Sequence, residues 1–387
     1  MNPALRLKSV LEKSERTIIG LMSGMSMDGV DLACVRIGGV FPEIKLELLG
    51  THFRPYSSAV RERLIKGQSC QVHEVSALGF SVAEEFSLCV KEFLGAKQLP
   101  NESIDAIGSH GQTLFHSSAL SSKHGSTLQV AHPSVIAEKT GIITIGNFRV
   151  RDIALGGQGA PLVSLADFLL YRSDTEVIAV NNLGSISNLT VVTPTIEDVS
   201  AFDTGPANMA IDYFARLVPG NSDGIDRDGV ISAKGNCIPP LLAKLLDLPF
   251  FKKKPPRAAG YEDFGPPVLD AIMKNHADAT PVDLVRTAVE FSALTIRDAY
   301  EQHVLPRYPM LAKIFFSGGG IYNLTLMKRI EDLLPKLRIE IFDPTFSDAK
   351  EAISFAVLAN ETLSGRAGNV VGATGATKRV VLGEIAV

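Results

Sequence analysis

The sequence predicts an α/β protein built from two lobes. Its 387 residues exceed the size at which a single hydrophobic core usually stops growing, so two domains are expected. A pattern of apolar strand, small polar turn and second strand occurs twice, with turns at Gly24 and Gly184 about 160 residues apart. We place lobe I at 1–150, lobe II at 151–348, and at 349–387 a C-terminal helix and tail that pack back toward lobe I.

Composition and charge narrow the range of partners. Hydrophobic residues make up 45% and charged residues 21%, as in soluble globular proteins. A net charge of −4 gives no reason to expect a nucleic acid or an anionic membrane as partner. The four cysteines form no CxxC pair, which argues against a zinc cluster or disulfide framework and fits a reducing cytosol. Because the sequence shows neither a membrane-length apolar run nor a signal peptide, we expect a cytoplasmic protein.

The most informative stretch is residues 18–31, IIGLMSGMSMDGVD. An apolar run enters a turn of Gly, Ser and Asp, and a second β-like run leaves it at 32–37, so a hairpin is expected. Gly24 and Gly29 let backbone N–H groups approach an anion closely. The spacing imitates a P-loop, but Val30 stands where that motif needs Lys and no helix-forming run follows, so a P-loop is excluded.

Side chains of the same turn carry hydrogen-bond donors and acceptors. Ser23 and Ser26 can donate to phosphate oxygens, and Asp28 and Asp31 are the carboxylates best placed to hold a metal ion. Hairpin turns rich in Gly and Ser also occur without any ligand, so this turn alone does not establish a phosphate site.

Strands and helices alternate along the rest of the chain. Period-two patterns, apolar runs and helical spacing define these segments. We expect strands at 44–55, 104–108, 142–147, 177–180 and 314–320, the last ending in three glycines, and helices at 58–66, 72–95, 281–303, 324–335 and 349–363. The last twenty residues, rich in Gly and Thr, are expected to form a loose tail.

Polar residues follow two strands of lobe I. His110 and Gln112 come after strand 104–108, at a strand end where open α/β sheets bind ligands. Taken alone, His110 is better explained as a satisfied structural histidine than as a catalytic residue. Arg149, Arg151 and Asp152 come after strand 142–147. A guanidinium there could bind a carboxylate, and a surface ion pair is the alternative for one of the two arginines.

Lobe II carries its own polar turns. The second hairpin turn holds Gly184 and Ser185. Asp203 precedes a Gly-Pro turn and a helical stretch, so it either caps that helix or points into a cleft. The segment 224–229 imitates a calcium loop but lacks the terminal Glu, which argues against calcium. The Lys- and Pro-rich run 250–260 is expected to be a solvated loop or the rim of a site.

Taken in order, nine motifs resemble the 1,6-anhydro-N-acetylmuramic acid kinase family of the actin/hexokinase-like superfamily. They cover residues 20–360, and they are GLMSGMSMDGVD, IGSHGQT, NFRVRD, GGQGAPLV, NNLGSISN, FDTGPANM, DRDG, SGGGIYN with LMKR, and EAISFAVLA. The resemblance implies a two-lobed actin/hexokinase-like (ribonuclease H-like) fold with a nucleotide cleft between the lobes. It also implies a cytoplasmic enzyme of peptidoglycan recycling.

The family reaction uses ATP and Mg²⁺ to convert 1,6-anhydro-N-acetylmuramic acid and water into N-acetylmuramic acid 6-phosphate. A bicyclic anhydrosugar has no free 6-hydroxyl, so its ring must open as the phosphoryl group arrives. A carboxylate can act as the general base that activates the water. The expected partner is therefore a small sugar, and a homodimer is possible.

The resemblance also assigns residues by their place in the motifs. Asp203 is the expected catalytic base and Glu351 assists, while Asp28 or Asp31 holds magnesium. The nucleotide is expected at Gly24, Met25, Ser26, Met27, Asp28, Gly29, Val30, Asp31, Gly184, Ser185, Gly318, Gly319, Gly320 and Asn323. The sugar is expected at His110, Gln112, Arg149, Asp152, Gly205 and Asn208.

Three positions depart from the family pattern. Met25 replaces a Thr of the first turn, Ser185 replaces a Gly of the second, and Asn147 replaces the Asp of DFR. These departures leave open a kinase for another sugar or anhydrosugar, or a catalytically weak nucleotide or sugar sensor. A chaperone-like ATPase is a poorer alternative, because no peptide-binding module follows the nucleotide lobes. Since Asp203 is intact, we expect an active kinase.

Overall fold

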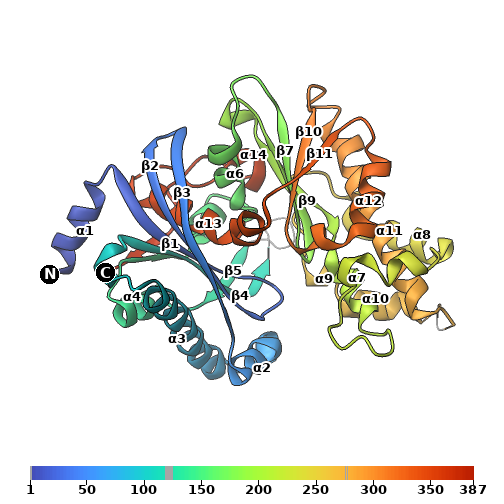
Figure 1. Ribbon diagram of the computed structural model, residues 1–387, viewed down its shortest axis with the longest axis horizontal. Coiled ribbons are helices and arrows are strands. Elements are labelled where there is room, and N and C mark those ends of the chain that lie inside the picture. Colours follow the sequence, from blue (N-terminus) through green and yellow to red (C-terminus); the bar gives the residue numbers. More distant parts are fainter. Residues whose placement is uncertain (1, 118–124, 275, 277) are drawn as a thin grey trace. The chain divides into compact units, whose positions relative to one another are not determined.

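The chain folds into two compact units, seen in a computed structural model that describes residues 2–117, 125–274, 276 and 278–387. Unit 1 comprises Met1–Tyr171 and Ala349–Val387, and unit 2 comprises Arg172–Asp348 (Figure 1). The boundary therefore lies after Tyr171 and not after residue 150. Helix α6, Val163–Tyr171, stays with unit 1 because it packs on strand β3 and its Asp167 pairs with Lys350.

One sheet forms the centre of unit 1, in the order β12-β6-β4-β1-β2-β3, with β5 paired to β4. Its strands are β1 Glu15–Ser23, β2 Gly29–Val40, β3 Glu43–Pro55, β4 Ala106–Ser117, β5 Ser126–Val130, β6 Thr144–Gly146 and β12 Glu384–Ala386. Strand β2 is antiparallel to β1 and β3, whereas β4 is parallel to β1 and to β6.

The sheet of unit 2 repeats that plan, in the order β11-β10-β7-β8-β9. Its strands are β7 Ile178–Leu183, β8 Ile186–Val192, β9 Ser200–Pro206, β10 Lys313–Ser317 and β11 Arg338–Ile341. Strand β8 is antiparallel to β7 and β9, and β10 is parallel to β7 and β11. An antiparallel meander extended by two parallel strands thus occurs in both units, which is the ribonuclease H-like strand order. The expected actin/hexokinase-like fold class is confirmed.

Helices cover both sheets, and the predicted long helices are present. In unit 1 they are α1 Pro3–Leu11, α2 Ser58–Lys66, α3 Val72–Lys97, α4 Pro133–Thr140, α5 Val150–Ala154, α6, α13 Pro344–Leu363 (which begins in unit 2) and α14 Val371–Thr374. In unit 2 they are α7 Asn208–Ala215, α8 Pro239–Leu246, α9 Tyr261–Phe264, α10 Pro266–Met273, α11 Pro281–Ala299 and α12 Leu324–Leu333. Among the described residues, no helix has the length and apolar character that crossing a bilayer requires.

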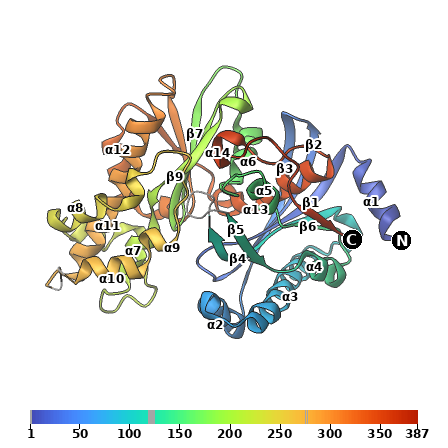
Figure 2. The same ribbon diagram turned by 180° about the vertical axis from the view of Figure 1, so that it is seen from behind.

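The packing of α13 on the sheet of unit 1 depends on two glycines in neighbouring strands (Figures 1 and 2). Gly20 of β1 lies beside Gly108 of β4 in the parallel register. A Cβ atom at Gly20 would lie 1.8 Å from the carbonyl oxygen of Ala352, and one at Gly108 would lie 2.2 Å from that of Phe355. Only hydrogen fits at these positions, so the helix backbone rests directly on the strands.

The C-terminal segment is not the loose tail that its composition suggested. Strand β12 pairs with β6 at the sheet edge, as Figure 2 shows beside the C-terminus. The side chains of Asn369 and Thr374 each donate to the buried carboxylate of Asp152, at 2.8 and 2.7 Å. Asn147, one of the departures from the family motif, donates to Glu384 at 2.9 Å. Long-range hydrogen bonds therefore hold a segment whose local sequence lacks helix or strand periodicity.

The loop 250–260 also differs from expectation, because it is not simply solvated. Phe250 and Arg257 are buried, at 1% and 4% exposure, although the three lysines between them are exposed. The Phe250 ring packs edge-on against Phe251 and Phe264 in the core of unit 2. The lysines thus mark only the outer side of a loop whose ends are anchored by aromatic rings.

The contact between α13 and the sheet predicts the effect of one added methyl group. We expect Gly20→Ala to lower the free energy of unfolding by about 2 kcal/mol or more, because backbone on both sides must move. Gly95→Ala is the matched control, since Gly95 lies in α3 with nothing within 4 Å of the new Cβ. Thermal unfolding followed by circular dichroism measures both. A Gly20→Ala midpoint equal to that of wild type would contradict the packing described.

Candidate active site

A buried hydrogen-bond network holds the first hairpin turn in place. Gln112 is 1% exposed, and its Nε2 donates to the carbonyl oxygen of Gly24 at 3.0 Å. The Ser23 hydroxyl lies 2.7 Å from the Gly29 carbonyl oxygen and 2.6 Å from Gln112 Oε1, two acceptors for its one hydrogen. Tyr56 donates its hydroxyl to Ser23 at 2.9 Å. The network holds both ends of the turn, and sequence patterns gave no sign of Tyr56.

The tip of this turn faces outward. Met25 is 46% exposed, and Asp28 is exposed while accepting a 2.7 Å hydrogen bond from the Ser26 hydroxyl. Met27 adopts a left-handed φ of 50°, which an unbranched side chain tolerates only where a tight turn demands it. Val30 is buried and Asp31 half-buried on the outgoing strand. Across the described residues, no three His, Cys, Asp or Glu side chains gather as a metal site.

His110 lies within β4, because the strand continues to Ser117 instead of ending before it. Its Nδ1 lies 2.9 Å from the Gly111 carbonyl oxygen, and its Nε2 lies 2.8 Å from Nη2 of Arg149. Because a guanidinium only donates, Nε2 is the acceptor and Nδ1 carries the proton. Burial and the neighbouring Arg149 lower the pKa of His110 to about 3. The ring is therefore neutral at physiological pH and cannot serve as an acid there.

Asp152 is fully buried, and its carboxylate organises a glycine-rich loop. Oδ2 accepts the backbone N–H of Gly159 at 2.8 Å, while Oδ1 accepts the two C-terminal side chains described above. Arg149 donates from Nη1 to the carbonyl oxygen of the same Gly159 at 2.6 Å. Asp152 and Arg149 thus hold one loop from two sides, and the carboxylate of Asp152 faces protein groups.

Glu351 lies on α13 beside a buried ion pair. Lys350 Nζ is 2.8 Å from Asp167 Oδ1, with side-chain exposures of 5% and 2%. Burial raises the pKa of Glu351, against the opposing charges of Lys350 and Arg149. One turn further along α13, the ring of Phe355 packs on His110 at a centroid distance of 4.7 Å. Helix α13 therefore brings Glu351 into electrostatic reach of Arg149, which sequence spacing alone could not show.

The second hairpin turn, in unit 2, is braced by Asn208. Its Nδ2 lies 3.0 Å from the Leu183 carbonyl oxygen and 2.9 Å from that of Gly184, and its backbone N–H donates to Gly184 as well. The Ser185 carbonyl oxygen accepts the N–H groups of the next helix start. Asn208 therefore acts on the turn in the same manner as Gln112 in unit 1. Gly205 lies at the end of β9, packed against Thr295.

The glycines of the two hairpin turns and of the segment 318–320 differ in the space around them. The atom nearest to an added Cβ would lie 3.9 Å away at Gly24, 3.4 Å away at Gly184 and 4.0 Å away at Gly319. None of these distances is a clash, so the fold itself does not require glycine there. Gly318 and Gly320 differ, because a Cβ would clash at 2.5 and 2.6 Å with the second hairpin. Open space at three turn glycines leaves their backbone accessible to a ligand.

Asn323, predicted as a nucleotide contact, is buried and caps α12. Its Oδ1 accepts the N–H of Leu326 at 3.0 Å, and its Nδ2 donates to Asp226 at 3.1 Å. Asp226 also accepts the hydroxyl of Ser232 at 2.5 Å. Through the buried carboxylate of Asp226, the DRDG segment is tied to Asn323, which follows the three-glycine segment.

Asp203 lies in β9 and does not cap the following helix. Its carboxylate Oδ2 accepts the N–H of Ala259 at 2.6 Å, and its own N–H donates to the carbonyl oxygen of Arg257 at 3.0 Å. The Arg257 guanidinium in turn donates from Nε to the Asp203 carbonyl oxygen at 3.0 Å. Asp203 is half-buried, and the Ala259 N–H orients its carboxylate. No sequence motif singled out Arg257.

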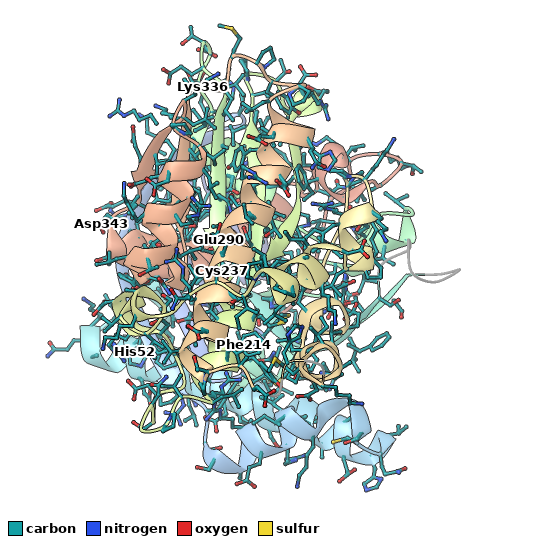
Figure 3. The ribbon with its side chains drawn as sticks, turned by 90° about the vertical axis from the view of Figure 1, so that its right-hand side faces the viewer. His52, Phe214, Cys237, Glu290, Lys336 and Asp343 are labelled. Atoms are coloured by element: carbon teal, nitrogen blue, oxygen red, sulfur yellow. The ribbon has the colours of Figure 1, made fainter. Side chains whose placement is uncertain are left out.

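A cavity of about 570 Å³ opens in unit 2 where α12 begins, next to Asn323. Four cationic and two acidic side chains stand among its walls. The lining comprises Asp228, Gly229, Val230, Ala233, Lys234, Arg286, Leu324, Thr325, Lys328, Arg329 and Asp332. Figure 3 looks onto this unit and labels Glu290 of α11, whose carboxylate accepts Arg329 Nε at 2.8 Å. Lys328 pairs with Asp332 at 2.9 Å and Arg286 lies 3.9 Å from Glu290, so neighbouring carboxylates balance most of the positive charge of the cavity wall.

Comparisons with known proteins point to one family. A family model described as anhydro-N-acetylmuramic acid kinase matches residues 16–387. A protein of that name from Caldanaerobacter subterraneus subsp. tengcongensis is 41% identical, over 98% of this chain and 99% of its own length. Another from Salinibacter ruber is 36% identical, over 98% of each chain.

Solved structures give weaker likenesses. Component A of Acidaminococcus fermentans (R)-2-hydroxyglutaryl-CoA dehydratase matches with a TM-score of 0.45 and 10% identity, over 90% of this chain and 99% of that one. A ROK family glucokinase from Streptomyces griseus, in complex with glucose and AMPPNP, matches with a TM-score of 0.39 and 9% identity, over 89% and 99%.

The brace beneath the first turn predicts a local effect. In Gln112→Leu the Gly24 carbonyl oxygen loses its amide donor, so we expect amide hydrogen exchange in the 24–28 turn to become about tenfold faster. Gln129→Leu is the matched control, because the side-chain amide of that half-buried glutamine on β5 donates to the hydroxyls of Thr113 and Thr127 and not to the turn. Exchange followed by mass spectrometry measures both. Equal exchange in Gln112→Leu and wild type would show that the turn does not depend on the brace.

Proposed function

The chain belongs to the anhydro-N-acetylmuramic acid kinase family and is therefore a kinase, and we propose that it phosphorylates 1,6-anhydro-N-acetylmuramic acid. ATP is the phosphoryl donor, water is consumed, and N-acetylmuramic acid 6-phosphate is the product. The observation that carries the proposal is the oriented, half-buried carboxylate of Asp203 in a full-length family match. A role in peptidoglycan recycling, a cytoplasmic location and a homodimer complete the proposal, on family grounds.

Asp203 is proposed as the general base. It takes a proton from water as the water oxygen bonds to the anomeric carbon, and the bond from that carbon to O6 breaks. The electron pair on O6 then forms the bond to the γ-phosphorus, and ADP leaves with the electrons of the broken P–O bond. Positioning of the carboxylate by the Ala259 N–H supports this role, because a general base must stay aimed at the proton that it removes.

The nucleotide side is proposed at the turn glycines with open space. An added Cβ would clash with nothing at Gly24, Gly184 or Gly319, and the absence of a side chain there would let phosphate oxygens approach the backbone N–H groups. The cavity of unit 2, which opens where α12 begins, is proposed to receive the nucleoside end. Met25 and Ser185 present their side chains at or near these turns, so neither departure removes a backbone donor.

Magnesium is proposed at Asp28 or Asp31. Mg²⁺ prefers oxygen ligands and is usually held by one or two carboxylates together with substrate phosphates, which fits an exposed aspartate on the first turn. When bound, the ion neutralises charge on the transferring phosphoryl group. Ser26, which donates to Asp28, would orient the carboxylate.

The sugar side is proposed at Arg149 and Glu351. The guanidinium suits the lactyl carboxylate of muramic acid, and the raised pKa of Glu351 suits hydrogen bonding to sugar oxygens. Neutral His110 would hold the Arg149 fork in place. Gln112, Asp152 and Asn208 are proposed to support these loops from within, because their polar atoms already bond to backbone or buried groups.

The proposed reaction is tested by isotope labelling. The purified protein is incubated with ATP, Mg²⁺ and 1,6-anhydro-N-acetylmuramic acid in water enriched in oxygen-18, and the product is analysed by mass spectrometry. We expect N-acetylmuramic acid 6-phosphate with one heavy oxygen at the anomeric position. Unlabelled product incubated in the same water controls for passive exchange. Absence of any sugar phosphate would reject the proposal and favour another sugar or a sensor.

The base assignment is tested separately with Asp203→Asn. This change keeps the side-chain shape and removes the proton acceptor, so we expect kcat to fall at least about 1,000-fold. Affinity for ADP, measured by titration calorimetry, should stay within about twofold, because the proposed nucleotide contacts are elsewhere. Near-normal turnover by the variant would mean that another group accepts the proton.

A further inference from the structure

Arg257 is a buried cation packed beside the proposed base. Its guanidinium lies 4.7 Å from the centre of the Phe250 ring and donates from Nη1 to the Lys253 carbonyl oxygen at 2.9 Å. Burial lowers the pKa of Arg257 to about 10, against the opposing charge of Asp203. The side chain therefore remains charged at neutral pH, in a place where a charge is costly to bury.

Four hydrogen bonds join Arg257 and its loop to β9. The Arg257 guanidinium spans the carbonyl oxygens of Asp203, at 3.0 Å, and Thr204, at 3.4 Å. The Arg257 carbonyl oxygen accepts the Asp203 N–H, and two residues further on Ala259 donates to the carboxylate. The donor that aims the carboxylate is therefore carried by a loop whose position depends on the guanidinium.

The other charged or titratable groups around this loop are ion-paired, exposed or neutral. Lys253 pairs with Asp263 at 3.3 Å, and Lys254 is exposed. His303 packs edge-on against Phe202, and its pKa is lowered by burial and by the charges of Arg257 and Lys254, so the ring is neutral. The carboxylate whose charge acts on Arg257 is that of Asp203.

We propose that Arg257 is the positioning residue of Asp203: it holds the loop 253–259 on β9 so that the Ala259 N–H aims the carboxylate, and its charge favours the ionised base. The inference rests on the proposed function, because Asp203 needs aiming only as the base. Arg257 touches backbone and aromatic rings in this arrangement, so it acts through Asp203 and does not itself meet the reacting atoms.

The test compares three variants of the full-length protein. Arg257→Met keeps the bulk of the stem and removes the charge and the donors, Arg257→Lys keeps the charge, and Lys254→Met is the control on the same loop. We expect kcat of Arg257→Met to fall about 100-fold, since a small misplacement of a catalytic group costs that much. KM for ATP and the affinity for ADP should stay within about twofold. Arg257→Lys should recover about tenfold, and Lys254→Met should match wild type.

The pH dependence of kcat supplies a readout that a purely structural role would not move. Removing a cation beside a carboxylate disfavours its ionised form, so the acid limb of the Arg257→Met profile should shift upward by about one pH unit. Arg257→Lys should keep the limb of the wild type. An Arg257→Met enzyme with kcat within threefold of wild type would overturn the inference. If Arg257→Met and Arg257→Lys both lose kcat and ADP affinity together, the inference is also overturned, because Arg257 would then serve only the folded structure.

Asp203→Asn distinguishes a failure of the base assignment from a failure of the positioning role of Arg257. If Asp203→Asn turns over normally, the base assignment of the proposed function fails. If Asp203→Asn is inactive while Arg257→Met is fully active, only the positioning role of Arg257 fails.

Discussion

The direct contact between the backbone of α13 and the sheet of unit 1 is the constraint on which the arrangement of the candidate residues of that unit depends. Because Gly20 and Gly108 carry no side chains, the helix sits on β1 and β4 at backbone distance. Phe355 of the helix then reaches His110, and His110 holds Arg149. A helix displaced by even one methyl group would break this chain of contacts, since packed interiors do not deform continuously.

In both units a side-chain amide hydrogen-bonds to the backbone of the hairpin turn. Gln112 under the first turn and Asn208 under the second donate amide hydrogens to turn carbonyl oxygens, on sheets that share one strand order. Buried amides that satisfy backbone groups keep a turn in one conformation, which lowers the entropy that a ligand must remove on binding. The corresponding supports on the proposed catalytic side are the carboxylate of Asp152 and the guanidinium of Arg257.

Burial and neighbouring charges act differently on the titratable candidate residues of unit 1. His110 is kept neutral beside a cation, whereas Glu351 is the carboxyl whose burial raises its pKa. The Lys350–Asp167 pair is buried, and breaking such a pair by changing one partner costs several kcal/mol. Arg149 acts on both titratable groups, since its charge lowers the pKa of His110 and opposes the rise in the pKa of Glu351.

The sequence by itself determined the fold class, the two hairpin turns, the long helices and the family, because apolar periodicity and contiguous motifs are local properties of the chain. Only the tertiary structure decided which motif residues face solvent and which brace a turn: Gln112 and Asn323 are buried, while the tip of the first turn is exposed. It also tied down the C-terminal segment and brought Arg257 to Asp203 across 54 positions. Such pairings arise from packing between distant segments, which no local pattern encodes.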